Sequence, residues 1–210
     1  MWASGAGGAG PLLESFKSVL EGGSALSAAA GYVVHEGCDH LFFVGFLGAG
    51  KSTLARNLGS LFHRPHVDTD RLVERALGRS VAEAFEELGE ERFRDLETQV
   101  LREMTQGDPA LVSCGGGVVL RPENRAILRE GGFVVFLKVR ADEAKSRIGD
   151  PSTRPLLGDA EAARKTNAER LPLYEEVADA TVDTSGRGVT ALAYKVKSIL
   201  EKEGILWPRK

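Results

Sequence analysis

The sequence predicts an α/β fold in which a parallel sheet has helices on both faces. Short apolar runs typical of buried strands alternate along the chain with segments of helical periodicity. A glycine-rich loop joins the first of these runs to the helical segment after it. Of 210 residues, 42% are hydrophobic and 27% are charged, a balance typical of globular proteins. This alternation favours parallel strands connected by crossover helices.

The expected elements follow one another in a regular order from residue 41 onward. Strands are predicted over residues 41–44, 66–68, 110–113, 133–139 and 180–183. Helices are predicted over residues 51–62, 70–77, 81–88, 92–104, 122–130, 141–147, 160–178 and 189–203. We expect a break in the helix over 160–178 at Pro172, because proline has no backbone N–H to donate.

The first forty residues differ in composition from the rest of the chain. They begin with a Gly/Ala-rich stretch, followed by helical periodicity over residues 11–26. We therefore predict an N-terminal extension over residues 1–40, partly helical or flexible. One α/β domain follows over residues 41–204, with a C-terminal tail over 205–210.

Charge and cysteine content exclude several classes of protein. The formal net charge is −3, so the chain lacks the basic footprint of a general nucleic-acid binder. Two cysteines cannot staple a secreted scaffold, and no apolar run is long enough to span a bilayer. The N-terminus does not have the pattern of a signal peptide. We expect a cytoplasmic monomer with no nucleic-acid or membrane partner.

The strongest motif is G-x-x-x-x-G-K-[ST], which residues 45–52 match at every fixed position. Glycines allow successive N–H groups to point at phosphate oxygens, and the following helix adds the positive end of its dipole. Lys51 can reach the β- and γ-phosphates, and the Ser52 hydroxyl can bind Mg²⁺. The alternative is a tight turn without a ligand, but the strand before and the helix after favour a nucleotide. The expected contacts are Gly48, Ala49, Gly50, Lys51, Ser52 and Thr53.

The chain has no N-K-x-D sequence for reading guanine and no large second module. A small-molecule kinase is therefore favoured over a GTPase or a motor. Asp68 and Asp70, at the end of the second strand, should face the phosphates. One carboxylate can hold the Mg²⁺ shell, and the other can accept the proton of the reacting hydroxyl or orient that hydroxyl. Both could instead cap the next helix, and the two interpretations are compatible.

Three further features suggest an acceptor site. Arg94 and Glu97 share one helix face and can pair there, although an exposed ion pair is the common alternative. Three glycines at residues 115–117 allow a ligand to approach the backbone, unless they form only a flexible loop. A Gly/Pro-rich loop over residues 147–159 contains Arg154, and Arg170 follows it; a mobile arginine there could close over phosphate, or each arginine could be a solvated surface charge.

Taken together, the segments GFLGAGKST, DTD, FRDLE, CGGGVV, RPLL and RLPLYEEVA resemble the shikimate kinases over about residues 41–203. The resemblance implies a three-layer P-loop kinase fold with a mobile lid. It also implies that ATP, with Mg²⁺, phosphorylates the 3-hydroxyl of shikimate on the route to chorismate and the aromatic amino acids.

On the acceptor side, the resemblance makes Asp70 the contact to the reacting hydroxyl and the candidate base. Arg94 and Arg170 would clamp the shikimate carboxylate, and Glu97 would hold Arg94. The remaining acceptor contacts implied are Phe85 and Phe93, as walls, and the backbone of Gly115, Gly116 and Gly117.

On the nucleotide side, the resemblance makes Arg154 the lid arginine on the phosphates, a catalytic residue beside Lys51 and Asp70. Arg147 would stack on adenine, with Arg187 near it. Asp68 would join Ser52 at the metal. Ser113 stands where many P-loop enzymes carry an acid, so it would act through the metal's water shell.

Two other functions remain open from the sequence. One is another P-loop kinase, acting on gluconate or a nucleotide, although two arginines and three glycines suit a small polyhydroxy carboxylate better. The other is a nucleotide-binding module without transfer activity. Against the second, the chain retains Lys51, Asp70, Arg94, Arg154 and Arg170.

Overall fold

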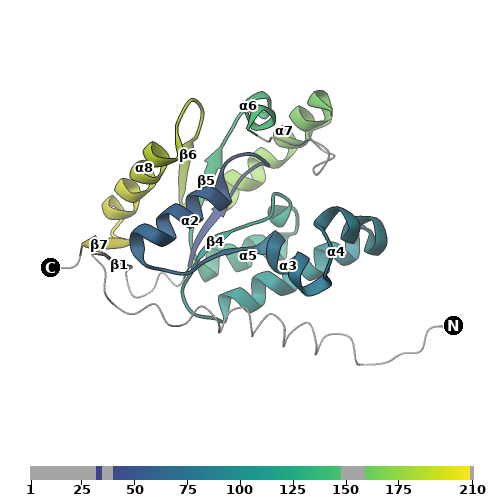
Figure 1. The fold of residues 1–210 in the computed structure, drawn as a ribbon, viewed down its shortest axis with the longest axis horizontal. Helices are drawn as coiled ribbons and strands as arrows, with labels where there is room; N and C mark the ends of the chain where they lie inside the picture. The colour runs from purple at the N-terminus through teal and green to yellow at the C-terminus, as the bar shows by residue number, and fades with distance from the viewer. Residues whose placement is uncertain (1–31, 35–39, 148–158, 209–210) are drawn as a thin grey trace.

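The computed structural model describes residues 32–34, 40–147 and 159–208. Five parallel strands form a central sheet with helices on both faces, as predicted (Figure 1). This sheet contains β2 (His40–Val44), β3 (His66–Asp68), β4 (Leu111–Ser113), β5 (Gly132–Lys138) and β6 (Ala180–Asp183). Two further strands, β1 (Tyr32–Val34) and β7 (Leu206–Pro208), pair with each other. The helices are α2 (Lys51–Phe62), α3 (Thr69–Leu77), α4 (Val81–Thr105), the 3₁₀ turn η1 (Val118–Leu120), α5 (Pro122–Gly131), α6 (Ala141–Ser146), α7 (Ala160–Val177) and α8 (Val189–Lys202).

The order of strands in the sheet is β3-β4-β2-β5-β6, with every neighbouring pair parallel. Strand β2 is central, and its Phe42 lies opposite Val112 of β4 and Val134 of β5. From β2 the chain passes to the β3 edge, and only later crosses to β5 on the other side. Ligands of open α/β sheets bind where the connections diverge in this way, beyond the carboxyl ends of the strands.

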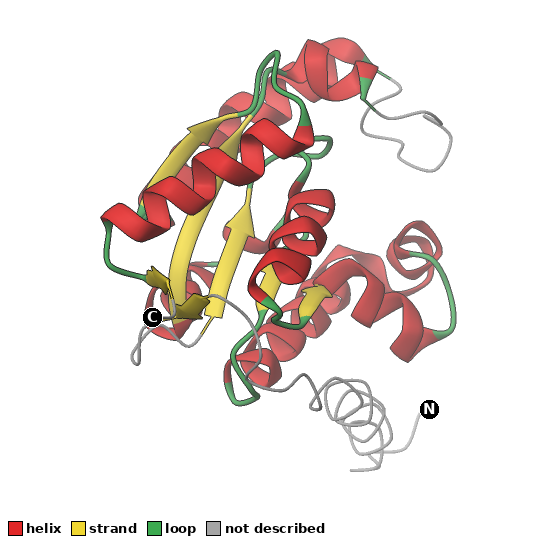
Figure 2. Cartoon of the chain, turned by 60° about the vertical axis from the view of Figure 1, so that its left-hand side comes forward, coloured by secondary structure: helices red, strands yellow, loops and turns green. Residues whose placement is uncertain are grey.

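Alternate side chains of β2 enter two separate cores. Leu41 and Phe43 pack in the core that α2 and α8 cover, whereas Phe42 and Val44 pack in the core that α4, α5 and α7 cover. Successive side chains of a strand point to opposite faces, so a strand apolar at every position must be covered on both. The sheet is the middle of three layers (Figures 1 and 2).

Helix α4 is two helices joined at Gly89, as the prediction of separate segments over 81–88 and 92–104 required. Gly89 has φ 75° and ψ 164°, a left-handed conformation that glycine adopts without a Cβ penalty. The first segment begins at Ser80, whose hydroxyl accepts from the Glu83 N–H while the Glu83 carboxylate accepts from the Ser80 N–H. The second segment carries the buried residues Phe93, Arg94 and Glu97.

The expected break at Pro172 is wrong. Helix α7 runs from Ala160 to Val177 as one element. Pro172 is exposed, while Tyr174 and Val177 are buried in the second core and Leu171 packs against it. Packing of these neighbours stabilises the helix despite one missing hydrogen bond.

The sequence did not predict the short antiparallel sheet formed by β1 and β7, in which Val33 lies opposite Trp207. It pairs a segment assigned to the extension with one assigned to the tail. Three-residue strands are too short for a recognisable alternation. The domain boundaries at residues 40 and 204 remain a prediction.

Two other predictions concern residues outside those described. They are the helix over 11–26 and the lid arginine Arg154, which lies within residues 148–158. Among the described helices, none combines the length and the apolar character needed to cross a membrane.

Candidate active site

The loop between β2 and α2 has the backbone that phosphate binding requires. Gly48 and Gly50 have φ of 78° and 90°, and Gly50 caps the first turn of α2. A Cβ on Gly48 would collide with the backbone of Ala144 in α6, so only glycine fits there. Positive φ at these glycines turns the chain sharply into the helix, whose first N–H groups have no partners within it. We call residues 45–52 the P-loop.

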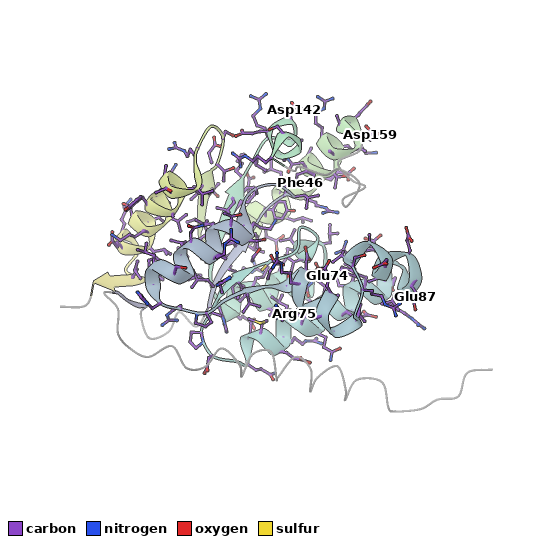
Figure 3. The ribbon with its side chains drawn as sticks, in the orientation of Figure 1. Phe46, Glu74, Arg75, Glu87, Asp142 and Asp159 are labelled. Atoms are coloured by element: carbon purple, nitrogen blue, oxygen red, sulfur yellow. The ribbon has the colours of Figure 1, made fainter. Side chains whose placement is uncertain are left out.

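Lys51 is buried against this loop. Its Nζ donates hydrogen bonds to the carbonyl oxygens of Gly45, at 2.8 Å, and Phe46, at 3.1 Å. The side chain begins at the N-terminus of α2 and turns back along the loop, so the ammonium lies beside the P-loop backbone. Figure 3 marks the position of this loop by Phe46, which lies between the labels of Asp159, the N-cap of α7, and Glu87 of α4.

Three oxygen atoms lie together at the ends of α2, β3 and β4. Ser52 Oγ donates to Asp68 Oδ2 at 2.5 Å and lies 3.1 Å from Ser113 Oγ. Asp68 also caps α3, since its Oδ1 accepts from the Arg71 N–H at 3.3 Å. The capping interpretation of Asp68 is therefore confirmed, and its role at Mg²⁺ stays a prediction. Hydroxyl and carboxylate oxygens are the donors that Mg²⁺ prefers, so the residues present fit this ion.

Asp70 lies in the first turn of α3, against the glycine loop (residues 115–117). A Cβ on Gly115 would overlap the carboxylates of Asp70 and Glu97, and the Gly115 N–H donates to Thr69 Oγ1 at 2.9 Å. The absence of a side chain at Gly115 therefore lets β4, α3 and α4 converge.

Arg94 is the buried cation of this group, with 8% of its surface exposed. Its Nη1 donates to Glu97 Oε2 at 2.7 Å, and its guanidinium carbon lies 5.2 Å from the ring centre of Phe85 and 5.6 Å from that of Phe93. A Cβ on Gly117 would overlap the guanidinium. The alternative of an ordinary exposed ion pair is wrong, because tertiary packing encloses both charges.

Glu97 is 3% exposed, and burial raises the pKa of its carboxyl, although the guanidinium of Arg94 opposes that effect. Removing a carboxylate from water disfavours its charged form, whereas a neighbouring cation favours it. The charge of Glu97 therefore depends on Arg94, and Arg94 in turn is fixed by Glu97.

Two side chains of α7 reach the glycine loop from the other side. Arg170 Nη1 and the Tyr174 hydroxyl both donate to the carbonyl oxygen of Gly116, at 3.1 Å and 2.6 Å. Tyr174 is fully buried and its ring stacks on Phe136, with 5.2 Å between the ring centres. The sequence singled out Arg170 but not Tyr174. The only signal was their shared segment RLPLY, in which they are one helical turn apart.

Arg147, the expected adenine contact, joins α6 to the loop after β6. Its guanidinium donates to Thr184 Oγ1 at 3.0 Å, to the Thr184 carbonyl at 2.6 Å and to Glu143 Oε1 at 2.6 Å. Glu143 Oε1 also accepts from the Gly186 N–H, and this hydrogen bond is the main reason why the pKa of Glu143 is lowered. Arg187 follows in the same loop, so the two residues predicted to contact adenine, Arg147 and Arg187, both lie near the end of β6. The sequence missed Glu143.

The carboxyl ends of the central strands thus carry the P-loop and, beside it, the Arg94 guanidinium, which aromatic rings and glycines enclose. A buried guanidinium fork suits a small carboxylate, and the adjacent P-loop suits a nucleoside triphosphate. The fold and this combination define a P-loop phosphotransferase of the small-molecule kinase class.

Within this class, the chain belongs to the shikimate kinase family: the family model described as "Shikimate kinase" matches residues 47–201. A shikimate kinase of Cupriavidus pinatubonensis is 40% identical over 171 residues, which cover 80% of this chain and 89% of that protein. One of Dehalococcoides mccartyi is 34% identical over 166 residues, covering 78% and 94%. The family predicted from the sequence motifs is confirmed.

Solved structures agree. A shikimate kinase from Acinetobacter baumannii, determined in complex with shikimate, has a TM-score of 0.75 and 33% identity, and the match covers 79% of this chain and 94% of that one. The Aquifex aeolicus shikimate kinase has a TM-score of 0.70 and 27% identity, covering 79% and 98%. A gluconokinase from Sinorhizobium meliloti, at 15% identity and a TM-score of 0.51, covers 80% and 94% and shares the fold alone.

Proposed function

We propose that this protein transfers the γ-phosphoryl group of ATP to the 3-hydroxyl of shikimate. The observation that carries the proposal is the buried Arg94–Glu97 pair, which lies against Gly117 beside Asp70 and the P-loop. A buried arginine with two aromatic neighbours is a costly arrangement that a small anionic acceptor would explain. Family membership supports the same reaction.

At the nucleotide end, the P-loop backbone and the Lys51 ammonium would bind the phosphates. Lys51 already lies on the loop carbonyls, so binding requires it to exchange backbone oxygens for phosphate oxygens. Ser52 and Asp68 would hold Mg²⁺, which when bound neutralises charge on the β- and γ-phosphates. Arg147 and Arg187 would contact the adenine, and Arg154 the phosphates.

At the acceptor end, Arg94 and Arg170 would hold the shikimate carboxylate. A guanidinium offers paired N–H donors that match a carboxylate, and its planar shape limits the orientations of the ligand. Phe85 and Phe93 would pack on the carbocycle. Bound between these groups, the acceptor ring would have one face against the aromatic side chains and its carboxylate at the arginines.

Asp70 would orient the 3-hydroxyl and accept its proton as the oxygen attacks phosphorus. Asp70 is the second residue of α3, two positions after the capping residue Asp68, so the groups that would hold the hydroxyl and the Mg²⁺ lie close together in the chain. Phosphoryl transfer depends mainly on alignment and on neutralising the equatorial oxygens, and fixed cations and backbone N–H groups supply both.

The test is a coupled ADP-release assay with Mg-ATP and four kinds of acceptor, each assayed separately. They are shikimate, its carboxamide analogue, gluconate and nucleoside monophosphates. We expect turnover with shikimate and at least an order of magnitude lower kcat/KM with the carboxamide, which cannot accept two charge-assisted hydrogen bonds. Phosphorus NMR of the product should place the phosphate on the 3-hydroxyl. Turnover with gluconate but not shikimate would overturn the proposal.

A further inference from the structure

The Gly116 carbonyl accepts two hydrogen bonds, and both donors come from α7. Arg170 Nη1 lies at 3.1 Å and Tyr174 Oη at 2.6 Å. A carbonyl oxygen has two lone pairs, so these two donors satisfy it fully. The Tyr174 hydroxyl makes the shorter of the two hydrogen bonds, and the Arg170 guanidinium is the second donor.

Tyr174 is held in place by packing rather than by this hydrogen bond alone. Its side chain is fully buried and stacks on Phe136 of β5 with an interplanar angle of 20°. Burial raises the pKa of its hydroxyl to about 12. The group therefore remains a neutral donor over the whole range in which a kinase works, aimed at one oxygen.

Arg170 has a different environment. It is only half-buried and precedes Tyr174 by four residues, so both side chains leave the same face of α7. The guanidinium carries five N–H groups: Nη1 donates to the Gly116 carbonyl, and Arg170 also makes a side-chain hydrogen bond to the Tyr174 hydroxyl. It is close enough to Tyr174 to oppose the rise in the pKa of the tyrosine hydroxyl.

We infer that Tyr174 is a positioning residue that sets the orientation of Arg170 toward the acceptor carboxylate. By satisfying Gly116 with a short hydrogen bond, the tyrosine prevents that carbonyl from drawing the guanidinium further onto itself. The remaining N–H groups of Arg170 are then available to the acceptor. This inference rests on the proposed function, because it takes the carboxylate of shikimate as the ligand of Arg170.

The test is Tyr174→Phe, which removes one oxygen and keeps the buried ring. Initial rates are measured with shikimate varied at saturating ATP, and with ATP varied at saturating shikimate. We expect the KM for shikimate to rise about threefold to tenfold, the range for loss of one buried hydrogen bond, with the KM for ATP changed less than about twofold. The matched control is Tyr194→Phe, which removes the same group from an exposed site on α8 and should leave both KM values unchanged.

A double-mutant cycle with Arg170→Gln separates positioning from a general loosening of the fold. If Tyr174 acts through Arg170, adding Tyr174→Phe to Arg170→Gln should change the KM for shikimate by less than about twofold. Full additivity of the two effects would overturn the inference, as would an equal rise of both KM values in Tyr174→Phe.

The same assay distinguishes failure of the inference from failure of the proposed function. A wild-type enzyme that phosphorylates shikimate, beside a Tyr174→Phe variant with an unchanged KM for shikimate, overturns only the inference. A wild-type enzyme without turnover on shikimate overturns both.

Discussion

The proposed nucleotide half of the site, which is the P-loop, and the proposed acceptor half are built in different ways. The P-loop is one continuous segment, and its positive-φ glycines and the N-terminus of α2 form its binding surface. The acceptor half is assembled from α3, α4, the glycine loop and α7. The first depends on local backbone geometry, and the second on side chains brought together by the tertiary fold.

This difference has an energetic side. The P-loop presents mainly backbone groups, whose arrangement follows from its glycines. The acceptor half instead buries the charged residues Arg94 and Glu97, and burial of ions is favourable only when each keeps its partner. Changes in the acceptor half should therefore affect both recognition of the acceptor and stability, whereas a change of Lys51 should affect the P-loop and phosphate binding and leave recognition of the acceptor intact.

The largest effect is expected for Lys51→Met, which removes the ammonium and keeps most of the buried stem. The turnover number should fall by about a thousandfold or more, because a fixed cation at the transferring phosphate is lost. Binding of shikimate, measured by calorimetry, should stay within about twofold of wild type, because the acceptor half is intact. Turnover at the wild-type level would contradict the assignment of the phosphate site.

Adjacent glycines provide the next test. In Gly117→Ala the new Cβ overlaps the Arg94 guanidinium, whereas in Gly116→Ala its nearest neighbours, among them Arg170 Nη1, lie at an ordinary contact distance of 3.8 Å. We expect Gly117→Ala to raise the KM for shikimate by about tenfold or more, and Gly116→Ala by about threefold at most. Equal effects of the two substitutions would show that Arg94 is not constrained at this contact.

A smaller effect should appear in stability against pH for Glu97→Gln. The pKa of Glu97 is raised above 4.5 in the folded protein, so the folded state holds this proton more tightly than the unfolded state. The stabilisation that the Glu97 proton contributes is thus complete below the pKa of the unfolded state and is lost as the pH rises through the pKa of the folded state.

The free energy of unfolding of wild type minus that of Glu97→Gln should therefore fall as the pH rises from acid to neutral. Urea unfolding of both proteins across that range measures it. Arg94 remains charged throughout, so its loss of a partner in the variant adds an offset that does not change with pH. A difference that rises with pH would mean that pairing with Arg94 outweighs burial.

What the sequence could predict divides along the same line. The P-loop, the parallel strands and the two segments of α4 were predictable because their signals are local: a glycine pattern, an apolar run and a helical period. Arg94, Glu97 and Arg170 could be named from motifs. That α4 buries the Arg94–Glu97 pair depends on packing around Phe85, Phe93 and Gly117, which no local pattern encodes.

The residues that the sequence missed are ones that contact predicted site residues or their loops. Tyr174 reads as an ordinary core aromatic, and Glu143 as an exposed helix residue, until the fold places Gly116 and Gly186 beside them. The β1–β7 pairing was missed for a related reason, since it joins two short segments that lie far apart in the sequence. The uninterrupted α7 shows packing prevailing over the local preference of Pro172.

The most direct test of the separation between the two halves is the pair of KM values for Arg94→Lys. Lysine keeps a cation beside Glu97 but loses the planar fork that a carboxylate requires. The matched control is Arg164→Lys, at an exposed ion pair with Asp142. We predict a KM for shikimate raised about tenfold or more in Arg94→Lys and a KM for ATP within about twofold of wild type, with both unchanged in the control. Equal rises of the two KM values in Arg94→Lys would contradict the account.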